Sequence, residues 1–193
     1  GALQSGDMAA SLASAKPDRR PGFSFCIITN GKRPVKLREE ILSIRALGIP
    51  DFEIWVGGDV PQGFDDILSV PMPEVAHAGR LGEMRNQLCR RAKFDHLVVA
   101  DDDMVFHPDF YQGLRRYGED YDVLCVRLLN TDGTRFWDWA KAGTTTEQRL
   151  LDYSDYDARV YVTGGLCVMK TVVSDFGQWD GQRGFYQLED VLI

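Results

Sequence analysis

The sequence of 193 residues lacks a long hydrophobic run and a surplus of basic residues. No apolar stretch approaches the roughly 18 residues of a membrane-spanning helix, so no transmembrane segment is expected. The net charge is −7, with 22 Lys and Arg against 29 Asp and Glu, which is the wrong sign for a nucleic-acid surface. A nucleotide remains compatible with this charge, because a metal ion and a few arginines can hold its phosphates.

Cysteine is also scarce, and its spacing excludes two further classes of protein. The four cysteines contain no C-x-x-C pair of the kind that binds zinc. Cys26, Cys125 and Cys167 lie in apolar, strand-like runs and Cys89 lies on a helix-like face, which is typical of buried free thiols. We therefore expect a reducing, cytoplasmic location rather than a disulfide framework.

The spacing of apolar residues predicts alternating strands and helices from residue 23 onward. This order predicts an α/β fold with a mostly parallel central sheet and flanking helices. The segments 61–73 and 130–149 are expected to be irregular. Strands are predicted at 23–29, 52–56, 97–100, 122–129, 158–162 and 166–169, helices at 35–47, 79–93 and 108–117, and a helical turn at 170–176.

The chain is expected to hold one domain after a short lead-in. Residues 1–21 are rich in Gly, Ala and Ser and are interpreted as a disordered or tag-derived lead-in, with Met8 as a candidate natural start. Residues 22–193 are expected to form a single domain. A helix-like pattern begins at Glu189 and the sequence stops four residues later, which suggests a truncated domain.

Three consecutive aspartates, Asp101, Asp102 and Asp103, come directly after the apolar strand at 97–100. In an open α/β sheet, ligands bind at the carboxyl ends of the strands. Adjacent carboxylates repel one another, so a positive partner is expected beside them. A divalent cation with oxygen ligands, which also holds substrate phosphates, fits this pattern. The alternative is a solvated acidic turn that caps the next helix.

Other polar residues are predicted to reach the same edge of the sheet. Thr29 and Asn30 follow the first strand and Asp59 follows the second, where they either contact a ribose or base or serve only as turn residues. Arg85 and Asn86 lie on the helix that precedes the aspartates. The arginine can bind phosphate or a base carbonyl, or it can belong to a solvated helix face.

A second group of candidates lies near the end of the sequence. Glu189 and Asp190 start a helix-like pattern and follow the paired glycines Gly164 and Gly165 and an aromatic loop with Trp179. A carboxylate at a helix start is either a cap or a general base that takes a proton from an attacking hydroxyl. The tryptophan either stacks on a sugar ring or fills the core.

Together these motifs resemble the GT-A glycosyltransferases, particularly family 2. The resemblance extends from about residue 23 to residue 193 and implies a nucleotide-sugar donor, with a UDP-sugar expected, and a Mn²⁺ or Mg²⁺ ion. It also implies a carbohydrate or other hydroxyl acceptor and inversion at the anomeric carbon. Residues 22–129 would form the nucleotide-sugar-binding part and residues 130–193 the acceptor side.

The resemblance also implies a role for each matching residue. The aspartates correspond to the D-x-D motif, which engages ribose and the metal-bound diphosphate. The implied roles are donor binding by Thr29, Asn30, Asp59, Arg85, Asp101 and Asp102, metal binding by Asp101 and Asp103, acceptor binding by Gly164, Gly165 and Trp179, and general-base catalysis by Asp190 with Glu189 as the alternate.

Two other functions stay open at this point. A sugar nucleotidyltransferase would carry a Gly-rich loop with Arg and Lys after the first strand, and the segment 30–34 is a poor version of it. A nucleotide-sugar-binding module without catalytic activity would bind the same ligands. A receiver domain is disfavoured, because its acidic pair normally follows the first strand, which here ends in Thr29 and Asn30.

Overall fold

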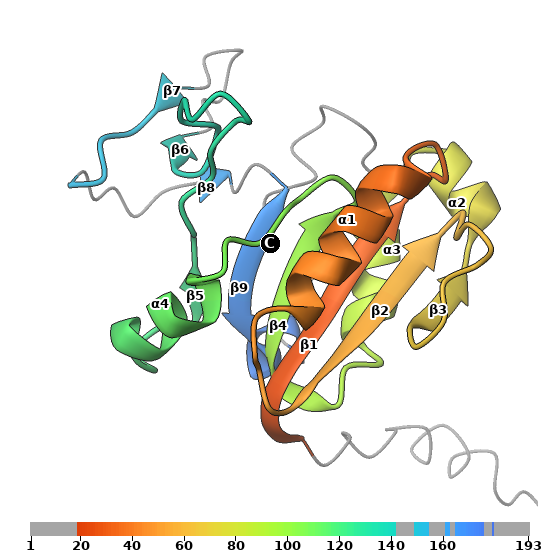
Figure 1. Cartoon of the computed structure of the whole chain (residues 1–193), viewed down its shortest axis with the longest axis horizontal. Helices are drawn as coiled ribbons and strands as arrows, with labels where there is room; N and C mark the ends of the chain where they lie inside the picture. Colours follow the sequence, from red (N-terminus) through yellow and green to blue (C-terminus); the bar gives the residue numbers. More distant parts are fainter. Residues whose placement is uncertain (1–18, 142–148, 155–160, 163–164, 176–178, 180–193) are drawn as a thin grey trace, which may run out of the picture.

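The computed structural model describes residues 19–141, 149–154, 161–162, 165–175 and 179. Within these ranges a six-stranded sheet has the order β3-β2-β1-β4-β9-β5 (Figure 1). Strands β1 to β4 are parallel, whereas β9 runs antiparallel to both β4 and β5. The expected mostly parallel α/β sheet is therefore confirmed. The strands are β1 (Arg20–Thr29), β2 (Phe52–Gly58), β3 (Leu68–Pro71), β4 (Phe94–Asp101), β5 (Val123–Leu124) and β9 (Leu166–Lys170).

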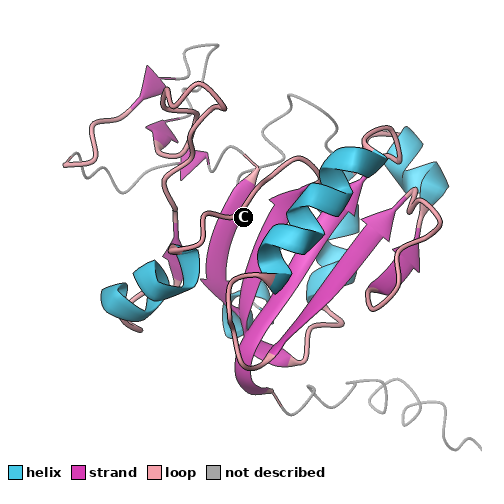
Figure 2. Ribbon diagram, in the orientation of Figure 1, coloured by secondary structure: helices cyan, strands magenta, loops and turns pink. Residues whose placement is uncertain are grey.

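Helices pack on both faces of the sheet (Figure 2). Phe25 and Ile27 of β1 point into one buried cluster with the apolar side chains of α1. Cys26 and Ile28 point the opposite way, into a cluster with those of α3. This alternation, which follows from the two-residue period of a strand, gives the sheet two hydrophobic cores. The helices are α1 (Pro34–Arg45), α2 (Pro73–His77), α3 (Leu81–Cys89), α4 (Phe110–Tyr117) and the 3₁₀ helix η1 (Thr171–Asp175).

Two segments differ from the sequence-based expectation. The stretch 61–73, expected to be a loop, contains β3, which pairs with β2 at the edge of the sheet. The strand expected at 122–129 is reduced to β5, whose two residues pair with β9. Beyond β5 the backbone turns to another partner, because the N–H of Leu128 donates to the buried carboxylate of Asp138 at 3.0 Å.

A second, three-stranded antiparallel sheet takes two strands from the part predicted to be irregular and its edge, and the third from within the strand predicted at 158–162. It has the order β7-β6-β8, from β6 (Ala140–Lys141), β7 (Arg149–Leu150) and β8 (Tyr161–Val162). Near it, Asp138 accepts hydrogen bonds from Arg135 at 2.6 Å and from the Tyr153 hydroxyl at 2.6 Å. Leu128, Arg135 and Tyr153 are thus joined through one buried carboxylate.

The cysteines and the helices agree with the expectations from composition. All four cysteines are free thiols, and Cys26, Cys89 and Cys167 are buried. Of the helices in the described ranges, none has the length and apolar content that crossing a bilayer requires.

A close approach between β1 and β2 shapes the carboxyl edge of the sheet. Gly58, the last residue of β2, has a φ of 118°, and a Cβ atom there would lie 2.0 Å from the carbonyl oxygen of Thr29. The next residue, Asp59, donates its backbone N–H to that same oxygen at 3.1 Å. A glycine is therefore required where the two strands deliver Thr29 and Asp59 to one edge.

We predict that Gly58→Ala lowers the free energy of unfolding by about 2 kcal/mol or more, because the added methyl group is strained by both the backbone angle and the contact. Urea denaturation measures this change. The matched control is Gly113→Ala in α4, where nothing lies within 4 Å of the added atom. The control should be stabilised by about 0.5–1 kcal/mol from helix propensity. Equal stability of the two variants would contradict the steric argument.

Candidate functional site

The carboxyl ends of β1, β2 and β4 meet at one edge of the sheet, as the sequence predicted. Ile28 of β1 pairs with Asp101 of β4, and Thr29 pairs with Gly58 of β2. The parallel register thus brings the turn after β1 beside the three aspartates. Thr29, Asn30, Arg33, Asp101 and Asp102 line a small cavity at this edge, together with Leu81 and Met84 of the neighbouring helix α3.

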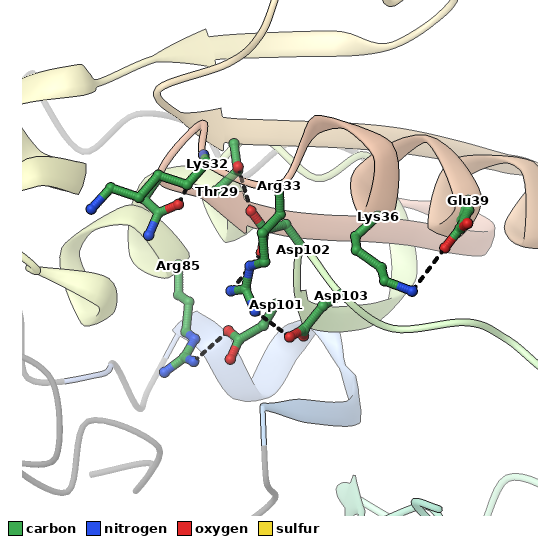
Figure 3. Close-up of polar contacts among 10 residues, drawn as sticks. Thr29, Lys32, Arg33, Lys36, Glu39, Arg85, Asp101, Asp102 and Asp103 are labelled. Atoms are coloured by element: carbon green, nitrogen blue, oxygen red, sulfur yellow. Dashed lines mark hydrogen bonds and ion pairs between the residues drawn. The ribbon is translucent and has the colours of Figure 1, made fainter. Parts of the chain in front are cut away.

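The three aspartates lie in different environments (Figure 3). The Asp102 side chain is 2% exposed and accepts a hydrogen bond from the Thr29 hydroxyl at 2.6 Å. The Asp101 and Asp103 side chains are 33% and 38% exposed. Asp101 and Asp103 are therefore accessible to a ligand, whereas Asp102 is buried and held by Thr29.

Two arginines supply the positive charge that three adjacent carboxylates require. Arg85 of α3 lies with its Nη2 atom 3.1 Å from Asp101 Oδ1. Arg33, in the turn after β1, has its Nη2 atom 2.7 Å from Asp102 Oδ1 and forms a second ion pair with Asp103. The sequence indicated a metal ion as the source of this charge and did not indicate Arg33. Its place in the turn at the same edge was the available signal.

Thr29 and Asn30 lie at the predicted edge, and their polar groups hold the turn. The Thr29 hydroxyl accepts a hydrogen bond from the Gly31 N–H at 3.0 Å and donates one to Asp102. It therefore links the turn after β1 to that carboxylate. The Asn30 side-chain oxygen accepts the Lys32 N–H at 3.1 Å. The turn chemistry that the sequence left open is present, and donor binding by these two residues stays a prediction.

Asp59 lies on the same edge with a partner that the sequence did not indicate. Its carboxylate is 2.9 Å from His77 Nε2, at the end of α2. Both side chains are exposed. Because no element was predicted between the loop at 61–73 and the helix at 79–93, this histidine had no predicted place near the site.

A fourth carboxyl group, that of Glu40, is buried close enough to the three aspartates to interact with their charges. Glu40 of α1 is fully buried, and no side chain among the described residues forms a hydrogen bond to its carboxyl oxygens. Burial, followed by the negative charges of Asp102 and Asp101, raises the pKa of Glu40 well above its ordinary value of 4.5, although the backbone N–H of Met104 acts in the opposite direction. Burial also raises the pKa of Asp102, although the Thr29 hydrogen bond and Arg33 act in the opposite direction. The raised pKa favours the neutral form of the Glu40 carboxyl group.

Asn86, next to Arg85 on α3, holds the backbone of Trp179. Its side chain donates to the Trp179 carbonyl at 2.7 Å and accepts the Trp179 N–H at 3.0 Å. The tryptophan is 5% exposed and packs with the core on the α3 side of the sheet. The structure therefore places this ring in the core, and stacking on an acceptor sugar does not fit its burial.

Gly165 packs directly against the acidic cluster. Its carbonyl accepts the Asp101 N–H at 2.9 Å, and a Cβ atom on it would lie 2.6 Å from Asp101 Oδ2. Acceptor binding by Gly165 stays a prediction. The other residues assigned to acceptor binding and catalysis, Gly164, Glu189 and Asp190, lie outside the described residues.

The exposed pair Asp101 and Asp103 suits a hard divalent cation, because both offer carboxylate oxygens at one edge. Across the described ranges, no group of three or more His, Cys, Asp or Glu side chains is arranged to hold a metal ion. Mg²⁺ and similar ions are commonly bound through one or two carboxylates, with substrate phosphates and water as the other ligands. The residues present fit a cation of that type.

Comparison with known proteins gives the same picture of the fold. The family described as “Glycosyltransferase like family 2” matches residues 24–193. The structure of S. aureus TarS 1-349 superposes with a TM-score of 0.61 at 16% identity, over 88% of this chain and 52% of that one. Its complex with UDP gives 0.61 at 15% identity over the same shares, and its complex with UDP-GlcNAc gives 0.55 at 16% identity over 82% and 48%. The chain thus spans about half the length of these structures. A search of curated proteins found no match.

We predict that Glu40→Gln becomes progressively more stable than the wild type as the pH rises. The folded protein keeps a proton on Glu40 above pH 4.5, where the unfolded chain has lost it, so wild-type stability falls with rising pH until Glu40 ionises in the folded state. Glutamine has no such proton to lose. The difference in unfolding free energy, measured by urea titration from pH 5 to pH 8, should grow by up to about 1.4 kcal/mol per pH unit.

The matched control for this test is Glu39→Gln. Glu39 lies next to Glu40 on α1, but its carboxylate is exposed and pairs with Lys36 at 3.1 Å. Its difference from the wild type should not grow with pH in this way. If the Glu40→Gln and wild-type curves ran parallel over the whole range, Glu40 would be ionised in the folded protein.

Proposed function

The chain belongs to the family 2-like glycosyltransferases, and on that premise we propose that it transfers a sugar from a nucleotide-sugar donor to a hydroxyl group of an acceptor. The observation that carries the proposal is the turn at Asp101–Asp103. It lies at the carboxyl edge of a parallel sheet, with two exposed carboxylates and two arginines beside a small cavity. A UDP-sugar is the expected donor, since a matched structure contains UDP and another contains UDP-GlcNAc.

In the proposed site, the nucleotide lies along the edge formed by β1, β2 and β4. Asn30 and Asp59 are assigned to the base and ribose, and Arg85 to the base or the phosphates. Thr29 and Asp102 act through their mutual hydrogen bond, which fixes the turn on which the ligand would lie. Asp101 and Asp103 would hold a Mn²⁺ or Mg²⁺ ion. The ion would supply positive charge that offsets the negative charge growing on the departing diphosphate.

The proposed reaction is a single displacement with inversion. The acceptor oxygen forms a bond to the anomeric carbon while the bond from that carbon to the diphosphate oxygen breaks. The acceptor proton passes to the Asp190 carboxylate, with Glu189 as the alternate base, and the nucleoside diphosphate leaves. This assignment rests on the Glu-Asp pair in the sequence and on the family to which the chain belongs.

Donor binding is tested by thermal unfolding with nucleoside diphosphates, with and without Mn²⁺. We predict that saturating UDP with Mn²⁺ raises the melting temperature by about 5 °C or more, because a ligand that binds only the folded state stabilises it. The gain should shrink in Asp103→Asn, which lacks one of the two proposed metal ligands. Absence of any shift with every nucleotide, for a well-folded wild type, would contradict the proposal.

General-base catalysis is tested with Asp190→Asn and the matched variant Glu189→Gln. We predict that Asp190→Asn lowers the rate of sugar transfer by roughly 10²-fold at an unchanged affinity for the nucleotide, because it removes the group that accepts the proton. Glu189→Gln should retain most of the activity. Near-normal transfer by Asp190→Asn would rule out general-base catalysis by this residue.

The alternative function, a sugar nucleotidyltransferase, would instead release pyrophosphate from a nucleoside triphosphate and a sugar phosphate.

A further inference from the structure

Arg33 forms ion pairs with two of the three aspartates, and no sequence motif assigns it a role. One guanidinium group contacts two carboxylates, with Nη2 at 2.7 Å from Asp102 and Nη1 paired with Asp103 (Figure 3). The two partners differ in freedom, because Asp102 is buried and Asp103 is 38% exposed. The Arg33 side chain is itself 45% exposed and comes from a turn rather than from a helix or strand. The pair with Asp103 is therefore the one that can open.

A guanidinium and a divalent cation are alternative partners for the Asp103 carboxylate. Two positive groups in contact with one carboxylate repel each other, and the repulsion grows as the local dielectric constant falls. The ion proposed to bind at Asp101 and Asp103 would therefore have to displace Arg33 from Asp103. Asp102 is fixed by Thr29 and remains beside the arginine, so it can keep the displaced side chain close to the site.

We infer that Arg33 is an internal counter-cation that holds Asp103 in the ligand-free protein and transfers to the diphosphate when a divalent cation takes over that carboxylate. The inference rests on the proposed function, because it assumes a nucleoside diphosphate as ligand. Arg33 lines the same cavity as Asn30 and Asp101. A diphosphate bound in that cavity would therefore lie close to the displaced guanidinium group. Its planar fork matches phosphate oxygens, as it matches carboxylates.

The first arm of the test measures Mn²⁺ binding without nucleotide, by electron paramagnetic resonance of the free ion. Arg33→Gln should bind Mn²⁺ about tenfold more tightly than the wild type, since the competing charge is gone. The matched control is Lys32→Gln, which removes the same charge from the neighbouring residue of the turn. Lys32 forms no ion pair with the aspartates in the described part of the chain, so its effect should be much smaller.

The second arm measures nucleotide binding at saturating Mn²⁺. Arg33→Gln should weaken UDP binding about tenfold, which corresponds to one lost charge-assisted contact to phosphate, and leave uridine binding unchanged. Uridine has no phosphate, and its binding can be followed by NMR titration. A role restricted to neutralising Asp102 in the folded protein would affect UDP and uridine equally.

A second variant keeps the test decisive if Arg33→Gln folds poorly with Asp102 left buried. Arg33→Lys keeps the charge, but an ammonium group does not span two carboxylates as a guanidinium does. Its Mn²⁺ affinity should therefore lie between those of the wild type and Arg33→Gln. Circular dichroism melts verify the folding of each protein.

The outcomes separate this inference from the proposed function. An unchanged or weaker Mn²⁺ affinity in the folded Arg33 variants overturns the inference, whether or not UDP binds. Equal losses of UDP and uridine binding overturn the transfer to the diphosphate. A folded wild type that binds Mn²⁺ but no nucleotide overturns the proposed function, and with it the transfer step, while competition at Asp103 is still decided by the first arm.

Discussion

The balance of charge at the carboxyl end of β4 is the constraint on which the rest of the site depends. Three consecutive aspartates can share one turn because Arg33 and Arg85 approach them from two different elements. The parallel pairing of β1 with β4 brings in the first arginine, and the packing of α3 against the sheet brings in the second. Loss of either arrangement would leave carboxylates facing one another without compensation.

The need to balance charge also applies to two buried carboxyl groups near this turn. Asp102 and Glu40 are both buried close to the exposed pair, and burial raises the pKa of each. A buried carboxylate is costly unless it is paired or neutral, and the two residues use the two different solutions. Asp102 is paired with Thr29 and Arg33, whereas Glu40 has no side-chain partner among the described residues and its raised pKa favours the neutral form. A protonated Glu40 would add no negative charge beside the three aspartates.

The sequence predicted the parts of this site that depend on strand order and failed for those that depend on side-chain pairing. The three predicted strands that end near Thr29, Asp59 and Asp101 were sufficient to place Thr29, Asp59 and the aspartates on one edge. Periodicity does not indicate which cation pairs with which anion, so Arg33 and His77 were missed. Glu40 was missed although it lies three residues after Leu37 and four before Ile44, on the buried face of α1. Among the strands, β3 was missed because a short edge strand has too few residues to show a period.

The adjacent residues Arg85 and Asn86 connect two regions that the sequence separates by almost 80 positions. On a helix, neighbouring side chains point about 100° apart, so one turn of α3 can contact both. Arg85 reaches Asp101 at the edge of the sheet, while Asn86 forms both hydrogen bonds to the backbone of Trp179. A shift of α3 would therefore move the acidic edge and the segment at Trp179 together. The two adjacent residues thus have different tasks, because Arg85 balances the charge of Asp101 and Asn86 holds the backbone of Trp179.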